Sequence, residues 1–201
     1  QIWTRLREND RPRVDVLYER AKKIAEGAAL MAGVSYEMEL ISGIYEIQVN
    51  RTGQLAMQKN LEKLGPIIYT DKEVEYANTI LRETGKPEKG LDGRVQSLRE
   101  TKPAQGGSTD VGDVSQIVPV IRMRATISAK DGPWHSWAVV ACSGMSIGHK
   151  GMVYAAKALG MTMADLYSDK KLIEEVKKDF KANKTNPVYE PRILPGPPKL
   201  D

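Results

Sequence analysis

The sequence predicts an α/β fold, and three observations support this prediction. Apolar and polar residues alternate in several short stretches, which is the period of a half-buried strand. Apolar residues recur at spacings of three and four in longer stretches, which is the period of an amphipathic helix. Of the 201 residues, 41% are hydrophobic and 28% are charged, so the chain has enough apolar surface to form a core.

Composition also excludes some classes of protein. No apolar run reaches the roughly 18 residues that a membrane-spanning helix needs. The 30 basic and 26 acidic residues are interspersed, and their net charge of +4 is a weak argument for nucleic-acid binding. We therefore expect neither a membrane nor a nucleic acid as partner.

The chain opens with the pattern strand, helix, strand. Residues 2–6 alternate, a helix is predicted from the Asp10 cap to Gly33, and residues 34–40 alternate again. A further strand is predicted over 44–49, after Gly43. Such a unit, with one polar sheet face, is half of a ferredoxin-like layer, so its other half must come from elsewhere.

A domain boundary is predicted at the turn 50–53, because the pattern then changes to helices. The first of these helices stops at Gly65 and Pro66, and the second starts at a capping box of Thr70 and Glu73. Residues 85–107 hold too many glycines and prolines for a regular element, which is typical of a functional or disordered loop.

One strand and two helices are predicted in the remainder of the chain. The strand covers 121–127, one helix runs from about 146 to 159 and stops at Gly160, and the other is capped by Ser168. Residues 187–201 are rich in proline and predict an extended, polyproline-like tail.

The chain has two histidines and one cysteine, which excludes a disulfide framework and a self-contained Cys/His zinc site. A lone cysteine fits a reducing compartment, so a cytoplasmic location is expected. The chain has no initiator methionine and begins inside a predicted strand, so we expect it to be part of a longer polypeptide.

Chemistry is predicted at a glycine-rich loop and at a histidine between tryptophans. The loop carries Asp110 and Asp113, and His135 lies between Trp134 and Trp137. Glycines let backbone approach a ligand, a carboxylate can orient an imidazole or contact a substrate, and imidazole is the commonest metal ligand. The alternatives are turn and helix-cap chemistry for the aspartates and an ordinary turn for the histidine.

These residues resemble those of the aminobenzoyl-glutamate utilisation protein B-like amidohydrolases. The similar motifs are GGSTDVGDVS at 106–115, PWHSW at 133–137, IGHKGM at 147–152 and AKKIAEGAALM at 21–31. This family belongs to the dinuclear-zinc amidohydrolases and peptidases, which include carboxypeptidase G and the aminoacylases. The resemblance extends over nearly the whole chain and is to the C-terminal part of the family's sequences.

The resemblance implies a zinc-peptidase-like α/β/α catalytic domain interrupted by a ferredoxin-like lid through which the subunits form a homodimer or higher oligomer. On this assignment residues 1–52 are the second half of the lid and dimerisation domain, 53–186 are the C-terminal part of the catalytic domain, and 187–201 are the tail. The implied partner is an N-terminal segment or subunit of the same enzyme.

The resemblance also implies roles for individual residues. His135 matches the last metal-ligating histidine of the family, and Ser108, Thr109 and Asp110 match the loop beside the substrate. Asp113 and His149 are candidates for supporting the metal ligands; the alternative for His149 is a cap or packing contact at a helix start. The implied cofactors are two divalent ions, zinc with manganese as the alternative, which ligands outside this chain mostly hold.

Other parts of the family's site have no counterpart in the chain. There is no His-x-Asp motif, and Glu174 and Glu175 lie among lysines on an amphipathic helix, where a solvated face is expected. The implied reaction is cleavage of the amide bond of an N-acyl or aminobenzoyl amino acid by a metal-bound hydroxide. The chain alone is therefore expected to be inactive.

A second hypothesis comes from a different class of protein. It holds that the chain is a non-catalytic dimerisation or interaction subunit that carries a remnant of the site. This hypothesis predicts that no metal is bound even in the full assembly.

Overall fold

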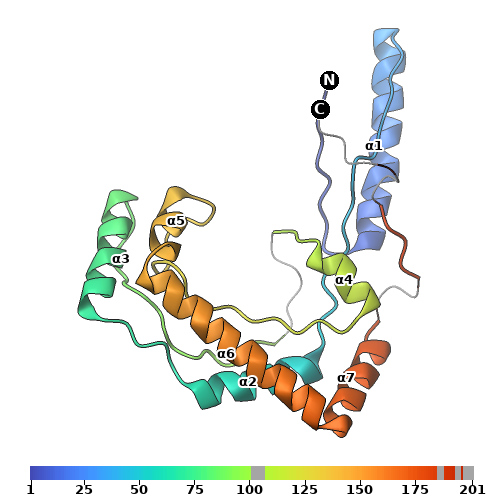
Figure 1. Cartoon of the computed structure of the whole chain (residues 1–201). Coiled ribbons are helices and arrows are strands. Elements are labelled where there is room, and N and C mark those ends of the chain that lie inside the picture. The colour runs from blue at the N-terminus through green and yellow to red at the C-terminus, as the bar shows by residue number, and fades with distance from the viewer. Residues whose placement is uncertain (101–106, 185–187, 193–195, 197–201) are drawn as a thin grey trace. The chain divides into compact units, whose positions relative to one another are not determined.

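The structure is a computed structural model that describes residues 1–100, 107–184, 188–192 and 196 (Figure 1). The helices in these residues are α1 (Arg11–Ala32), α2 (Arg51–Leu64), α3 (Asp71–Glu83), α4 (Val111–Ile117), α5 (Trp137–Ser143), α6 (Ser146–Ser168) and α7 (Lys170–Ala182).

The chain divides into two compact units, each described by itself below. Unit 1 comprises Gln1–Val49, Glu100–Val120 and Phe180–Asp201, and unit 2 comprises Asn50–Arg99 and Ile121–Asp179. The first division lies close to the predicted boundary after residue 52. The grouping of 100–120 with the N-terminal residues was not predicted, and the assignment to a lid and a catalytic domain stays a prediction.

The predicted first helix is confirmed as α1. The Asp10 side chain accepts a hydrogen bond from the Arg13 amide at 3.0 Å, and Pro12 occupies the first turn, where its missing amide hydrogen costs nothing. The helix ends at Gly33, whose φ of 65° is a left-handed conformation that glycine adopts without strain.

The two helices predicted after the boundary are confirmed as α2 and α3. The Asn50 side chain caps α2 by accepting a hydrogen bond from the Gly53 amide at 2.8 Å. Both halves of the predicted capping box at α3 are present: the Thr70 hydroxyl accepts from the Glu73 amide, and the Glu73 carboxylate accepts from the Thr70 amide.

The helix predicted from about residue 146 to 159 is present as α6, but its predicted end at Gly160 is wrong, because α6 continues to Ser168. A glycine inside a helix costs only about 1 kcal/mol, and the buried Ala158 and Thr162 on either side of Gly160 offset that cost through packing. Ser168 therefore belongs to α6, and the side chain that caps α7 is Asp169, which accepts from the Leu172 amide at 3.1 Å.

The four predicted strands, at 2–6, 34–40, 44–49 and 121–127, are absent from the described residues, where no segment is assigned as strand. A strand requires a neighbouring strand for its backbone hydrogen bonds. In the predicted segments, backbone amides instead donate to helix residues: the Gln48 amide donates to the Ser115 hydroxyl at 2.8 Å, and the Val34 amide donates to the Ala29 carbonyl at 3.0 Å. The α/β fold class, whose sheet would need strands from elsewhere, stays a prediction.

Two seven-residue helices, α4 and α5, were not predicted. Each is too short for apolar periodicity to show. The predicted proline-rich tail lies mostly outside the described residues, as do residues 101–106 of the predicted loop. No helix in the part of the chain that the structure describes is long and apolar enough to cross a membrane.

The core of unit 2 lies where α3, α5 and the start of α6 meet. Its buried side chains are Ala77, Ile80, Leu81, Ala129, Ala138, Cys142 and Ile147. Farther along α6, Asn60 of α2 donates to the Thr162 hydroxyl at 3.1 Å and to the Asp165 carboxylate at 2.7 Å. These bonds pair polar groups that would otherwise be buried without partners.

Gly151 lets α6 pack closely on the extended segment before it. A Cβ added at Gly151 would overlap the backbone carbonyl oxygen of Thr126, whereas a Cβ added at Gly160 of the same helix would meet nothing within 4 Å. Substituting each glycine by alanine therefore distinguishes two effects. Only the Gly151 variant disturbs close packing, whereas both variants change the helix propensity.

We expect Gly151→Ala to lower the free energy of unfolding by about 1–3 kcal/mol, because the backbone must move apart. The matched control, Gly160→Ala, should raise it by up to about 1 kcal/mol, because alanine favours a helix. Urea unfolding of the full chain measures both changes. Equal stability of the two variants would contradict the packing described for α6.

Candidate functional site

The predicted site residues fall in both units. Ser108, Thr109, Asp110 and Asp113 belong to unit 1, and the two histidines belong to unit 2. The structure therefore describes the surroundings of each group separately.

The glycine-rich loop leads directly into α4. Ser108 and Asp110 are exposed, and the Thr109 hydroxyl donates to the Asp110 carboxylate at 3.3 Å. The Asp110 side chain makes no capping hydrogen bond to α4, although its backbone oxygen accepts from the Asp113 amide at 3.0 Å. The exposed carboxylate is thus available to a ligand, as its predicted role requires.

Asp113 binds side chains and backbone of unit 1. One carboxylate oxygen accepts from the Tyr45 amide at 3.3 Å, and the other accepts from the Tyr189 hydroxyl at 3.2 Å. Burial, followed by the nearby Asp113 charge, raises the pKa of Tyr189 above its usual value. Asp113 therefore holds the tail residue Tyr189 against α4; its predicted support of a metal ligand stays a prediction.

The start of α4 lies unusually close to the backbone at Tyr45. A Cβ at Gly112 would overlap the Tyr45 carbonyl oxygen, so the loop can approach this segment only with a glycine there. The buried Gln116 side chain donates to the Glu46 carbonyl at 2.9 Å. Together with the bond from Gln48 to Ser115, these contacts fix the orientation of α4 and hence of the glycine-rich loop.

His135 lies in a tight loop before α5. Its φ is 59° and that of Asp131 is 58°, so two residues that are not glycine adopt the left-handed conformation in the same short loop. Aspartate and histidine adopt this conformation more readily than most residues, and residues held in such uncommon conformations cluster at binding and catalytic sites. The loop is held by Ser136, whose hydroxyl donates to the Pro133 carbonyl at 2.7 Å and accepts from the Ala138 amide at 3.3 Å.

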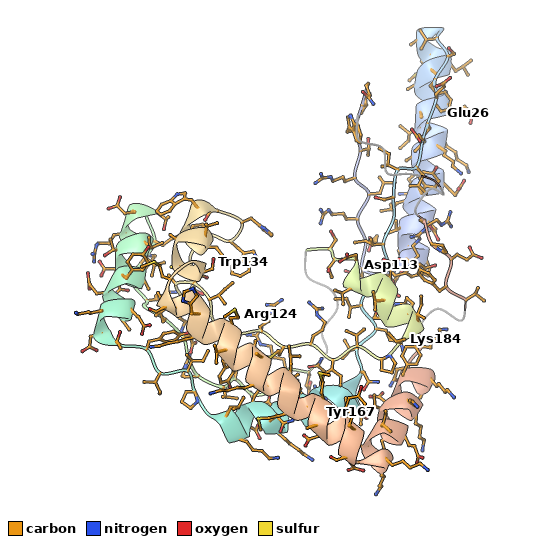
Figure 2. All side chains as sticks on the ribbon, in the orientation of Figure 1. Glu26, Asp113, Arg124, Trp134, Tyr167 and Lys184 are labelled. Carbon is orange, nitrogen blue, oxygen red and sulfur yellow. The ribbon has the colours of Figure 1, made fainter. Side chains whose placement is uncertain are left out.

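The imidazole of His135 is exposed and lies at the edge of the Trp134 ring, with 6.3 Å between ring centroids. Trp134 is itself 61% exposed (Figure 2). No hydrogen bond joins this imidazole to another residue in the described ranges. Its position suits a ligand that approaches from outside the unit, because a histidine packed in the core would be buried and paired.

His149 lies in the first turns of α6 and is also exposed. Its neighbours on α6 tie the helix to α3 through Glu73. The Lys150 ammonium and the Ser146 hydroxyl both donate to the Glu73 carboxylate at 2.6 Å. These bonds, with Lys150 first, lower the pKa of Glu73 to about 2 from the usual 4.5.

The described residues do not fit a dinuclear metal centre by themselves. Within them, no three or more histidine, cysteine, aspartate or glutamate side chains lie close enough to hold a metal ion. A metal site of the kind implied by the resemblance needs several such ligands, and His135 is predicted to be one of them. Such a site would need its remaining ligands from outside the described part of the chain.

Glu174 and Glu175 lie on a solvated face of α7, as predicted. Their side chains are 64% and 52% exposed, and they lie 4.0 and 3.8 Å from the ammonium groups of Lys170 and Lys171. Exposed pairs of this kind contribute little to stability.

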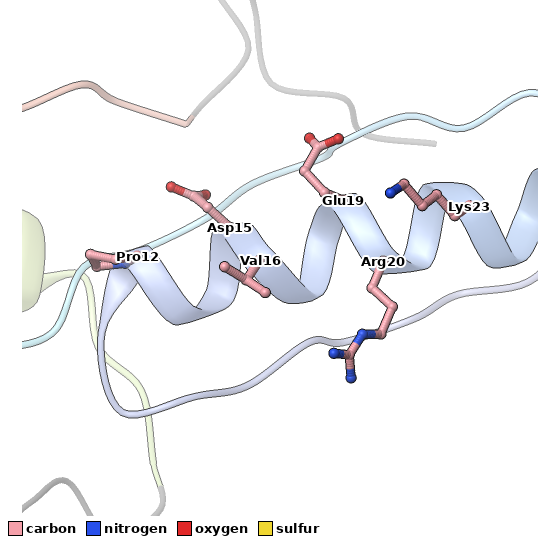
Figure 3. A pocket seen from close by; sticks show the side chains of 6 residues that line it. All are labelled: Pro12, Asp15, Val16, Glu19, Arg20 and Lys23. Carbon is pink, nitrogen blue, oxygen red and sulfur yellow. The ribbon is translucent and has the colours of Figure 1, made fainter.

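A shallow, open hollow lies along one side of α1 (Figure 3). All its lining residues come from that helix: Pro12, Asp15, Val16, Glu19, Arg20 and Lys23. It contains none of the predicted site residues and is open to solvent, so it does not resemble a substrate pocket.

Comparison with known proteins finds a similarity to a hydrolase subunit. The chain is 30% identical, over 92% of its own length, to the p-aminobenzoyl-glutamate hydrolase subunit designated B from Escherichia coli (strain K12). This match confirms the predicted resemblance. The chain covers 45% of that relative's length. No family model matches the chain, and no solved structure matches it.

The link through Glu73 between α3 and α6 was not found by sequence reasoning. The capping box identified Glu73, but its second role depends on Lys150, 77 positions away. A lysine and a serine one helical turn apart are too common in sequences to indicate such a partner. Only the packing of the two helices brings these groups together.

We expect the stability of unit 2 to fall as the pH is lowered from about 4.5 to about 2. The folded pKa of Glu73 lies below its unfolded value, so its ion pair stabilises the fold fully above that range and is lost through it. Glu73→Gln should lower the free energy of unfolding at neutral pH by about 1–3 kcal/mol and weaken this pH dependence.

The control for this experiment is Glu75→Gln in the same helix. Glu75 is 64% exposed and pairs with Arg82 on the surface, so its loss should cost less than about 1 kcal/mol. Thermal unfolding as a function of pH measures both variants. Identical pH profiles for Glu73→Gln and the unmodified chain would show that Glu73 does not have the proposed role.

Proposed function

We propose that the chain is the C-terminal portion of a metal-dependent amidohydrolase that cleaves an N-acyl or aminobenzoyl amino acid. The observation that supports this most is the 30% identity to the E. coli p-aminobenzoyl-glutamate hydrolase subunit over 92% of the chain. The partial coverage of that relative supports a second element of the proposal. An N-terminal segment or subunit of the same enzyme completes the site.

The surroundings of the candidate residues support the same function. His135 is exposed on a strained loop, and Asp110 is exposed on the glycine-rich loop. In the proposed enzyme, His135 ligates one of two divalent ions, which are zinc with manganese as the alternative. Ser108, Thr109 and Asp110 contact the substrate. The completing segment supplies the remaining metal ligands and the carboxylate that transfers the proton.

The test is to assemble the chain with the part of the E. coli relative that the chain does not match. We expect p-aminobenzoyl-glutamate to be hydrolysed by the assembly and by neither part alone. Mutation of a residue that supports a metal ligand typically lowers activity by roughly 10- to 100-fold. In the assembly, His135→Ala removes a ligand itself, so we expect kcat/KM to fall by at least this factor. It should also lower the bound metal, which elemental analysis measures.

Glu174→Gln is the matched control, because this carboxylate lies on the solvated face of α7. We expect it to leave both metal content and activity unchanged. Full activity of the His135→Ala assembly would refute the role of this histidine. An assembly that forms but binds no metal would favour the alternative, a non-catalytic dimerisation or interaction subunit.

A further inference from the structure

Helix α6 has apolar residues on two opposite sides. One side packs inside unit 2 through the buried Ile147, Gly151, Ala158 and Thr162. The other side carries large apolar residues spaced four or seven positions apart, which places them in one line along the helix. We call this line the α6 stripe; it consists of Met145, which is the residue just before α6, and of Met152, Leu159, Met163 and Tyr167 within the helix.

The α6 stripe is open in the described structure. Met152 and Met163 are 62% and 55% exposed, and Tyr167, at the far end of the helix, is 87% exposed (Figure 2). From Met145 to Tyr167 the helix rises by roughly 33 Å. A helix that is apolar on both sides is usually buried on both sides, and a long exposed apolar patch commonly marks an interaction surface.

The chemistry of the stripe restricts what covers it. None of its five residues carries a charge, so a phosphate or nucleic-acid ligand is not favoured. Ala156 and Gly160 lie on the same side between the large residues and are exposed, which leaves the middle of the helix free for close approach by a flat surface. Methionine side chains also adapt readily to the shape of an apolar partner.

We propose that the α6 stripe is the docking surface for a sheet formed by the segment that completes the enzyme. The inference rests on the proposed function. The matched relative is more than twice as long as its aligned part, so more than half of its length has no counterpart here. Unit 2 presents helices without a strand in its described residues, and a helical layer of an α/β domain buries its apolar side against a sheet.

Docking on this surface would also place His149 at the edge of the contact. This histidine lies on the same side of α6, between Met145 and Met152. In the docked protein its imidazole lies at the edge of the buried contact. It then separates the apolar stripe from Lys150, whose ammonium is bound to Glu73.

The experiment uses the full chain and, as probe, the part of the E. coli p-aminobenzoyl-glutamate hydrolase subunit that the chain does not match. Native mass spectrometry and titration calorimetry measure the complex. We expect a one-to-one complex whose Kd rises more than tenfold in Met152→Glu and in Met163→Glu. Leu55→Glu is the control, because Leu55 is 47% exposed on α2, outside the stripe.

The variants must unfold at the same temperature as the unmodified chain, which their exposed positions lead us to expect. Met163→Ala, which shortens the side chain without adding charge, provides a second measure and should weaken the complex less than Met163→Glu. Unchanged binding by the stripe variants, or no complex with the unmodified chain, would overturn the proposal. So would a dimer of the chain alone that Met163→Glu dissociates, because the occupant would then be a second copy.

The outcome for docking is separate from the outcome for the proposed function. A complex that depends on the stripe but does not hydrolyse p-aminobenzoyl-glutamate would refute the function and leave the docking surface in place. Hydrolysis by an assembly that tolerates Met152→Glu and Met163→Glu would refute the docking surface and leave the proposed function in place.

Discussion

The packing of α6 is the constraint on which unit 2 depends. Its buried side joins the core near α3 and α5 at one end and the polar contacts with α2 at the other. Gly151 allows the close contact with the backbone at Thr126, and this contact sets the distance between α6 and that segment. His149 lies on α6 itself, and the loop of His135 leads into α5, which packs on α6. The positions of both histidines therefore depend on the packing of α6.

Polar side chains hold irregular segments and helices together within each unit, in addition to backbone bonds such as the one from the Ile67 amide to the Gly93 carbonyl at 2.8 Å. In unit 1 the backbone near Tyr45 is held by Asp113 and by the buried Ser115. In unit 2 the Glu73 carboxylate joins two helix starts by accepting hydrogen bonds from both. Such bonds hold an irregular segment against a helix without requiring a neighbouring strand, because each side chain accepts or donates at its own angle.

The candidate site combines exposure with a rigid support. His135 and Asp110 are open to ligands, yet each follows or precedes a segment whose backbone is tightly held by neighbouring residues. A binding residue is most effective when its loop is fixed before the ligand arrives, since less conformational freedom is lost on binding. Within its own unit, each of these candidate residues thus lies beside a backbone segment that is already fixed.

The sequence by itself determined α1, α2 and α3 and the caps at the starts of α1 and α3, because such a cap needs only residues three or four positions apart. The Asp10 cap, the capping box of Thr70 and Glu73, and the end of α1 at Gly33 were all predicted. The motif around His135 also indicated the resemblance that the comparison confirms. Tertiary structure decided the rest: whether alternating segments pair, that α6 continues through Gly160, and that Lys150 binds Glu73. These features depend on contacts between distant residues, which local patterns do not encode.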